Sequence, residues 1–529
     1  MRILLINPYY PISETPSPPL GLACLAASLE SAGIEVRILD FVVFPYSKKY
    51  LEKELKQFDP QMIGVTAVTM NVADALTVVR DAKSISPEIF SVMGGPHVTF
   101  CAKETLEACS ALDFVVLGEG EKTIVELCRT LKKDMKWETV QGLVYREKEQ
   151  IHFTGDRPFI ANIDTLPAPA RHHIPLGRYR ALGMPISITT SRGCPFQCIF
   201  CVGRKMVGPK VRYRNPEFIV DELTGLSNLD FHQINIADDL FTASKRHCLA
   251  VCDEIIRRGL KIRWTSFARV DTISPEMLHR MKAAGCTAVS FGVESGSPEI
   301  LKRIKKGITI EQVFEAIKMC TVAGITPQAS FILGLPGETP ETLQATVTLG
   351  NRLKEMGVLH GYHLLAPFPG TDVRENIRQY DLQIMSHDWR DYHANRAIVR
   401  TTAVSQEMMN DVVVDWEHQF NLWLDDIKQR RESGEASESE AWPLTNLEHT
   451  VLLYDLMMNH ALEDKGVFRH NDAPVSDDAA IKMLVDRLAG TITQSQNQMV
   501  RTLAHALRRG YLSYTAGDGY CRWKWVDYL

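Results

Sequence analysis

Three cysteines stand close together in the middle of the chain. Cys194, Cys198 and Cys201 have the spacing CxxxCxxC and follow a short apolar, strand-like segment at residues 186–190. Clustered thiolates hold metals, but no fourth Cys or His lies at the spacing that a structural zinc site uses. A 4Fe-4S cluster held by three thiolates leaves one iron open to a substrate or cofactor. The cysteines therefore favour a reactive iron–sulfur centre over a structural zinc site.

Six strand–helix units surround these cysteines. Strands are expected at residues 186–190, 233–236, 263–266, 288–291, 329–333 and 362–366. Helix starts are marked by Asn, Ser or Thr before Pro-Glu, at residues 215–217, 274–276, 297–299 and 339–341. Six such units predict a partial barrel, whose site forms at the carboxyl ends of its strands, where the cysteines lie.

The first 140 residues alternate short apolar strands with amphipathic helices, which predicts a doubly wound parallel α/β sheet. Strands are expected at residues 2–7, 35–39, 62–68, 89–93 and 114–116. Their carboxyl ends carry loop-forming residues, and ligands of such sheets bind there. Neither GxGxxG nor GxxxxGK[ST] follows the first strand. We therefore expect a flat or extended cofactor at this edge, and not NAD.

The rest of the chain is connecting or helical. A hairpin at 142–146 and 150–153 leads into a proline-rich connector at 166–170. After residue 400 helices are expected at 406–431, 448–458 and 477–509, with a flexible surface loop at 431–440. The predicted domains are thus 1–140, a hairpin and linker at 141–180, the barrel at 181–400 and a helical region at 401–529.

Composition excludes several classes of protein. The net charge of the 529 residues is −5, without a block of like charges, which disfavours a nucleic-acid partner. The basic stretches 204–214 and 302–306 are expected to be solvated faces. No apolar run reaches the roughly 20 residues of a membrane helix, and no cleavage site follows the start. We expect a cytoplasmic protein with no membrane span and, because most of the 12 cysteines are scattered, no disulfide framework.

The cysteine run, with Phe200 just before the third cysteine, resembles the signature of the radical S-adenosylmethionine (SAM) superfamily. The resemblance implies that Cys194, Cys198 and Cys201 hold a 4Fe-4S cluster, whose open iron chelates the amino and carboxylate groups of SAM. One electron from the cluster would then cleave SAM to a 5′-deoxyadenosyl radical. A flavodoxin or ferredoxin-type protein is the expected reductant.

Later strands resemble further SAM-binding motifs of this family. Asp238 and Asp239 resemble the acidic motif that receives the SAM amino group, although one of them could cap a helix. Arg269 suits the SAM carboxylate, and Glu294 suits ribose hydroxyls or the amino group. Gly334 would admit the adenine, although close packing explains it equally well. The residues expected to contact SAM are Phe200, Asp238, Asp239, Ser266, Arg269, Glu294, Gly334 and Pro367.

A doubly wound domain with the segments 94–97 and 117–121, placed before such a barrel, resembles the cobalamin-binding branch of the superfamily. The residues then expected to contact cobalamin are Tyr9, Thr66, Val68, Thr69, Met70, Gly94, Gly95, Pro96, His97, Glu119 and Gly120. The loop between Pro8 and Pro19 lacks the histidine of a DxHxxG motif. A lower axial histidine is therefore not expected, and His97 is assigned to cofactor contact only. An empty or structural domain is the alternative.

The resemblance implies a cobalamin-dependent radical SAM methyltransferase that acts on an unactivated carbon, or on phosphorus, of a small molecule. A second outcome for the same parts is an oxidative cyclisation or ring rearrangement, as in the anaerobic magnesium-protoporphyrin ester cyclase. A third hypothesis is a non-catalytic iron–sulfur or cobalamin-binding sensor. No catalytic residue is assigned, and the helical region after residue 400 is expected to close the barrel mouth.

Overall fold

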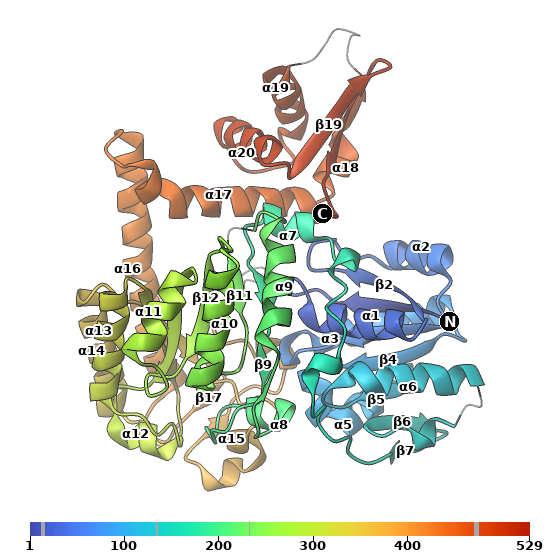
Figure 1. Cartoon of the computed structure of the whole chain (residues 1–529). Helices are drawn as coiled ribbons and strands as arrows, with labels where there is room; N and C mark the ends of the chain where they lie inside the picture. The colour runs from blue at the N-terminus through green and yellow to red at the C-terminus, as the bar shows by residue number, and fades with distance from the viewer. Residues whose placement is uncertain (12–15, 134–135, 232, 470–475) are drawn as a thin grey trace.

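The computed structural model describes residues 1–11, 16–133, 136–231, 233–469 and 476–529. Figure 1 shows three parts: an N-terminal sheet domain in blue, a central domain in green and yellow, and C-terminal helices with a small sheet in orange and red. The loop between Pro8 and Pro19, where no histidine occurs, includes residues 12–15, which lie outside the described residues.

The N-terminal domain is built on parallel strands in the order β2-β1-β3-β4-β5. Their bounds are β1 (Arg2–Asn7), β2 (Glu35–Asp40), β3 (Met62–Thr66), β4 (Phe90–Gly94) and β5 (Phe114–Val116). Successive side chains of β1 face opposite cores: Ile3 and Leu5 pack in one, Leu4 and Ile6 in the other. Helices α1 (Leu20–Ser31) and α6 (Gly120–Lys133) cover the first face, and α2 (Lys48–Phe58) and α3 (Val72–Ile85) the second. The predicted doubly wound sheet is confirmed.

The hairpin of β6 (Leu143–Glu147) and β7 (Gln150–Phe153) belongs to this same sheet. β6 pairs antiparallel with β5, so that Phe114 stands opposite Tyr145. The prediction that groups the hairpin with the linker at 141–180 is therefore wrong. Its physical reason is that β5 has only three residues and would otherwise leave an unpaired sheet edge.

The central domain contains six parallel strands in the order β8-β11-β12-β13-β14-β15, and no pairing between β8 and β15 closes it. The strands are β8 (Ile186–Ile188), β11 (Ile234–Ile236), β12 (Trp264–Ala268), β13 (Cys286–Glu294), β14 (Thr326–Leu333) and β15 (Leu359–Leu364). Its helices are α9 (Pro216–Ser227), α10 (Lys245–Arg257), α11 (Pro275–Ala283), α12 (Pro298–Arg303), α13 (Ile310–Ala323) and α14 (Pro340–Glu355). The predicted caps Asn215, Ser274, Ser297 and Thr339 each accept a backbone N–H of the helix that follows. The partial barrel is thus confirmed.

Short elements lie at the carboxyl ends of the barrel strands. Beside the cysteines stand β9 (Ser191–Arg192), α8 (Gly203–Val207) and β10 (Arg212–Tyr213), and after β15 come α15 (Asp372–Glu375), β16 (Gln383–Ile384), the 3₁₀ turn η8 (Trp389–Asp391) and β17 (Val399–Arg400). Val373 N donates to Ile199 O at 3.0 Å, and Lys205 Nζ donates to Gly370 O at 2.7 Å. The segment after β15 therefore covers the loop that carries the cysteines.

The C-terminal part contains helices and a small sheet. The helices are α16 (Gln406–Glu432), α17 (Glu438–Met458), α18 (Ala461–Lys465), α19 (Asp477–Leu488) and α20 (Gln496–Arg508). An antiparallel sheet joins β18 (Val467–Arg469), β20 (Tyr520–Trp525) and β19 (Leu512–Gly517), which the prediction of a mainly helical region did not include. The alternation of buried Cys521, Trp523 and Trp525 with exposed residues is the strand signal that the sequence carries there.

The predicted loop at 431–440 is shorter than expected, because only residues 433–437 lie outside helices. α16 continues to Glu432 and α17 starts at Glu438, because Ser437 and Glu440 form a capping box. Arg431 pairs with Glu448, which ties the two helices together across the short turn. Acidic and small residues, typical of disorder, thus form a helix junction here.

α17 to α20 lie at the opposite end of the barrel from α8, which follows the cysteines in the chain, while α16 runs along the side of the barrel (Figure 1). Thr450 of α17 donates to Leu182 O at 3.0 Å, and Arg509 pairs with Asp230, both next to the amino ends of barrel strands. For α17 to α20 the prediction that this region closes the barrel mouth is therefore wrong, and only the start of α16 reaches the carboxyl end of a barrel strand, where Met409 packs on Gly334. The segment after β15 takes that place because its chain returns across the carboxyl ends of the strands.

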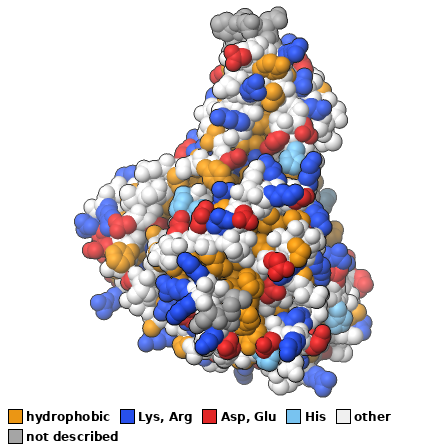
Figure 2. Space-filling view, turned by 90° about the vertical axis from the view of Figure 1, so that its right-hand side faces the viewer, with side chains coloured by type: hydrophobic (Ala, Val, Ile, Leu, Met, Phe, Trp, Pro, Cys, Tyr) orange, Lys and Arg blue, Asp and Glu red, His pale blue; other side chains and the backbone are white. Residues whose placement is uncertain are grey.

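No described helix is both long and apolar enough to cross a membrane. Figure 2 shows the side of the molecule that the N-terminal domain forms, where basic and acidic side chains are interspersed. The end of the chain folds back onto α7 (Leu176–Ala181): Gly177 N donates to Asp527 O at 2.9 Å, and Arg178 pairs with Asp527. The connector thereby contacts all three parts of the protein.

Candidate functional site

A cavity of about 430 Å³ lies between the carboxyl ends of the N-terminal strands and the first strands of the barrel. Six residues expected to contact cobalamin line it: Thr66, Gly94, Gly95, Pro96, Glu119 and Gly120. Barrel residues complete the wall, among them Thr189, Ser191, Arg192, Met206, Val207, Ala237 and Asp239. The cavity thus joins the two domains that the sequence assigns to cobalamin and to SAM.

Glycines make the floor of this cavity. A Cβ on Gly64 would lie 2.8 Å from Leu5 Cδ2, and a Cβ on Gly95 would lie 2.6 Å from Ala67 O. Gly95 also has φ +105°, which side chains other than glycine rarely adopt. The side walls are apolar at Leu25 and Ile124. The cradle therefore fits an extended group that approaches the backbone closely, such as the nucleotide tail of cobalamin.

The remaining predicted cobalamin contacts, Tyr9, Val68, Thr69, Met70 and His97, do not line the cavity. Thr69 begins the 3₁₀ turn η2 (Thr69–Asn71), which packs against η8 of the segment after β15. The buried His97 ring meets the Trp389 ring edge-on at 4.9 Å between centroids. Burial lowers the pKa of His97 to about 4, so the ring is neutral at pH 7.

An ionic network crosses the domain boundary at the cavity wall. Glu119 accepts hydrogen bonds from Ile160 N at 2.7 Å and from Arg212 at 2.8 Å, while Arg192 reaches both Glu119 at 3.1 Å and Glu121 at 2.6 Å. Burial opposes ionisation of Glu119, but the hydrogen bonds from Arg212 and Ile160 N and the positive charges of Arg192 and Arg212 together outweigh it and hold the pKa below its usual range. Burial opposes the charge of Arg192, but its pairing with Glu121 and the nearby Glu119 outweigh this and raise the pKa of Arg192. The network fixes the first domain against the loop that leads to the cysteines.

Sequence reasoning missed part of this wall. Arg192 stands two residues before Cys194, yet nothing in its spacing indicates that Glu119 and Glu121 are its partners. Gly64 lies inside a strand, and a glycine in that position often marks close approach of a ligand or of another backbone. That signal was available in the sequence.

The three cysteines lie on the loop after β9. Their sulfur atoms are not all within 4.8 Å of one another. A single zinc ion with Zn–S bonds of about 2.3 Å would draw them to about 3.8 Å. The backbone N–H of Gly203 also points to Cys201 Sγ, at 3.4 Å. The donor set and its spacing suit a larger iron–sulfur cluster better than a single metal ion.

The two neighbouring acids have different positions. Asp238 is buried and accepts hydrogen bonds from Thr190 N at 2.6 Å, Thr190 Oγ1 at 2.5 Å and Ser191 Oγ at 2.7 Å. Asp239 lines the cavity, and a Cβ on Gly203 would lie 2.9 Å from Asp239 Oδ1. Neither acid caps a helix, because Ser244 caps α10. Asp238 therefore holds the loop that precedes the cysteines, and Asp239 is left to face a ligand.

Arg269 lies beside the cysteine loop. Its guanidinium stacks on Phe196 at 3.6 Å, makes two hydrogen bonds of 2.9 Å to Asp271 and donates to Lys306 O at 2.6 Å. Its Nη1 atom and Ser266 Oγ are buried and have no hydrogen-bond partner. Two such orphaned polar atoms in one region are costly unless a bound molecule satisfies them. They fit a polar ligand such as SAM.

Glu294 is paired inside the barrel. Lys306 Nζ donates to Glu294 Oε1 at 2.8 Å, and the side chains are each 8% exposed. Glu294 has φ +69° at a bulge in β13, and a Cβ on Gly292 would lie 2.2 Å from Glu294 Oε1. The expectation that 302–306 is a solvated face is therefore wrong for Lys306, because the chain turns inward after α12.

The other expected SAM contacts pack against neighbouring elements. A Cβ on Gly334 would lie 2.7 Å from Met409 Sδ of α16, as the packing alternative predicts. Gly334 N donates to the buried Glu338 at 2.7 Å, and burial raises the pKa of that carboxyl to about 7. Pro367 O accepts from Arg374 at 3.0 Å, and Phe200 is half-buried against the core. None of Phe200, Gly334 and Pro367 lines the cavity.

Comparison with known proteins matches both halves of the site. Residues 13–128 match the model of the B12 binding domain, and residues 188–350 match that of the Radical SAM superfamily. An uncharacterized methyltransferase of Pyrococcus horikoshii is 35% identical over 421 residues, which cover 78% of this chain and 91% of that protein. The anaerobic magnesium-protoporphyrin IX monomethyl ester cyclase of Cereibacter sphaeroides is 28% identical, over 80% of this chain and 70% of its own.

A solved structure supports the fold. The radical SAM methyltransferase TsrM of Kitasatospora setae, with cobalamin and a [4Fe-4S] cluster bound, superimposes with a TM-score of 0.65 at 21% identity. The match covers 78% of this chain and 84% of that one. At this identity the likeness concerns the arrangement of domains and not the individual residues.

Proposed function

This chain belongs to the radical SAM superfamily and carries an amino-terminal B12 binding domain, and we propose that it is a cobalamin-dependent methyltransferase of a small molecule. The methyl acceptor is an unactivated carbon, or a phosphorus centre. When bound, the 4Fe-4S cluster and SAM supply a 5′-deoxyadenosyl radical and cobalamin supplies the methyl group, so the hard chemistry belongs to the cofactors.

One observation carries this proposal: the cavity in the first domain is continuous with the wall beside the cysteine loop. Asp239 lines the cavity and also approaches Gly203, whose backbone N–H contacts Cys201 Sγ. A group held over Gly94 and Gly95 would therefore lie next to a group held at the cysteines. Transfer of a methyl group between the two cofactor sites and a substrate requires this proximity.

The residues of the chain then have the following proposed roles. Cys194, Cys198 and Cys201 hold the cluster. Arg269 and Ser266 offer unpartnered donors to the carboxylate and other polar groups of SAM, and Asp239 accepts from its amino group. Glu294, held by Lys306, accepts from hydroxyl groups of the ribose. These assignments are supported by burial and by the orphaned atoms described above.

A reductant must reach the cluster, and a basic surface lies beside it. Ile199 N donates to Ile304 O at 3.2 Å, which places the exposed Lys302, Arg303 and Lys305 next to the cysteine loop. An acidic one-electron carrier of the flavodoxin or ferredoxin type fits this surface. A cytoplasmic location is proposed because such carriers act there.

The second candidate function is an oxidative cyclisation or ring rearrangement. The similarity to the magnesium-protoporphyrin ester cyclase over 80% of this chain favours it. The two functions use the same cofactors and differ in the fate of the methyl group of SAM.

Anaerobic incubation of the reconstituted protein with SAM, reductant and cobalamin tests the proposal. Mass spectrometry should find both 5′-deoxyadenosine and S-adenosylhomocysteine, because one SAM is cleaved and another donates its methyl group. Deoxyadenosine alone would favour cyclisation. Neither product, from protein with full iron and cobalamin content, would refute both functions.

A further inference from the structure

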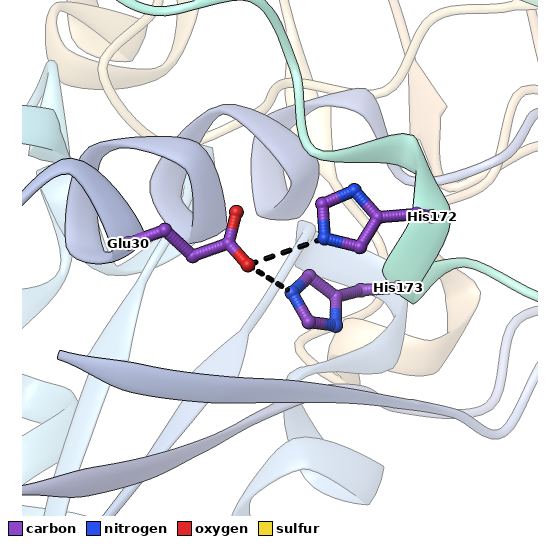
Figure 3. Close-up of side chains that lie close together, drawn as sticks. All are labelled: Glu30, His172 and His173. Carbon is purple, nitrogen blue, oxygen red and sulfur yellow. Dashed lines mark hydrogen bonds and ion pairs between the residues drawn. The ribbon is translucent and has the colours of Figure 1, made fainter. Parts of the chain in front are cut away.

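A second group of histidine and carboxylate side chains lies outside this site, where the interdomain connector meets α1. Glu30 stands in the last turn of α1, and His172 and His173 belong to the 3₁₀ turn η5 (Arg171–His173). Figure 3 shows both imidazole rings pointing at the same carboxylate. Within the described part of the chain, only these side chains bring three possible ligand atoms from His, Cys, Asp or Glu within 4.8 Å of one another.

The distances match those between ligands of one metal ion. His173 Nε2 lies 2.8 Å and His172 Nε2 lies 3.2 Å from Glu30 Oε1. Ligand atoms bound at about 2.1 Å in tetrahedral or octahedral sites are separated by about 3.0–3.4 Å. Because a carboxylate only accepts, both histidines donate N–H to one oxygen, so their protons occupy the place that a cation would take.

The electrostatics of the helix end also favour a cation there. The carboxyl end of α1 carries the negative pole of the helix dipole, and no basic residue stands in its last turn. Glu30 adds a further negative charge at that end. His173 and His172 both donate to this carboxylate. The histidines are thus the groups that compensate this charge in the protein.

The ligands are held in place but remain accessible. Ala170 N donates to Ala23 O of α1 at 3.0 Å, and the buried Arg171 pairs with Glu222 of α9 at 2.6 Å. These two contacts anchor η5 to α1 and to α9. The His172 side chain is 65% exposed and that of Glu30 38%. A hydrated ion can therefore enter a preformed site and keep water in its open positions.

We propose that Glu30, His172 and His173 bind a divalent transition-metal ion of the zinc class. Two imidazoles and one carboxylate are ligands that Zn²⁺ accepts, with water as the fourth. The ion would bind the connector to α1, whose Gly21, Leu22 and Leu25 line the interdomain cavity. The site therefore joins the connector to the helix on which the cofactor cavity depends.

Isothermal titration with ZnCl₂ tests this on the reconstituted protein, in which the cluster occupies Cys194, Cys198 and Cys201. The wild type should bind one extra zinc ion per chain. The double variant His172→Gln/His173→Gln keeps N–H donors toward Glu30 but loses the imidazole ligands, and its affinity should fall by at least about tenfold. Glu30→Gln should weaken binding as well. His279→Ala, on the exposed face of α11, is the matched control and should not change the titration.

Zinc K-edge absorption of the loaded wild type should show two imidazole ligands. A loss of less than tenfold in the double variant, or absorption without imidazole, would overturn the proposal and leave these residues as an ion pair. Circular dichroism confirms that each variant is folded. Because the readout is zinc binding, failure of this site leaves the proposed methyltransferase function untouched.

Discussion

Gly94 offers a direct test of the cofactor cavity. It lines the cavity at the end of β4, and a Cβ there would meet only Val116 O, at 3.8 Å, which is ordinary contact. A leucine at this position can therefore be placed without moving the backbone. Its side chain has to extend into the cavity itself.

The size of the effect follows from the volumes. Four added carbon atoms take up roughly the room of four water molecules, about 120 Å³, or more than a quarter of the cavity of about 430 Å³. Overpacking of this kind costs about 1–3 kcal/mol when neighbours can adjust. We therefore expect Gly94→Leu to weaken cobalamin binding by about 5- to 150-fold.

The assay is cobalamin retained after gel filtration, read from its visible absorption, together with a titration of the free protein. Iron content and circular dichroism should match the wild type, because no cysteine or core residue changes. Gly225→Leu is the control: Gly225 is exposed on α9, and no atom lies within 4 Å of an added Cβ. Equal cobalamin affinity in Gly94→Leu and the wild type would refute the placement of the cofactor in this cavity.

Four further predictions follow from the site. Replacement of Cys194, Cys198 and Cys201 together by Ala should abolish the iron–sulfur absorption. Four irons per chain in that triple variant would refute their assignment as cluster ligands. Lys306→Met should lower the free energy of unfolding, measured by urea denaturation, by about 3–5 kcal/mol because it leaves the buried charge of Glu294 without a partner. Adding Glu294→Gln to that variant should restore part of the lost free energy of unfolding. The pKa of Glu338 is raised from 4.5 to about 7, so between these pH values the folded state holds a proton that the unfolded chain releases. The free energy of unfolding should therefore fall as the pH rises from 4.5 to about 7. Glu338→Gln should raise the free energy of unfolding by about 3 kcal/mol at pH 8 but not at pH 4. With His97 outside the cavity, electron paramagnetic resonance of the cobalt(II) form should show no protein nitrogen splitting, and a splitting that His97→Ala removes would contradict this.

Local features of the chain were readable without the structure. The strands at 2–7 and 114–116 were predicted with the bounds that the structure has, since short apolar runs between polar loops specify strands by themselves. Ser274 and Thr339 cap the helices after them because a cap needs only its own side chain and the next turn. The spacing of the three cysteines likewise lies within a single loop.

The rest required the tertiary structure, because it depends on contacts between distant segments. The sequence assigned the hairpin to a linker and Lys306 to the solvent, although β6 pairs with β5 and Lys306 pairs with Glu294. Arg192 meets Glu119 only when the barrel packs against the first domain. Burial and ion pairing are properties of that packing, whereas residue type and spacing are properties of the chain. The sequence therefore determined which chemistry the protein carries, and the fold decided which side chains face the cofactors.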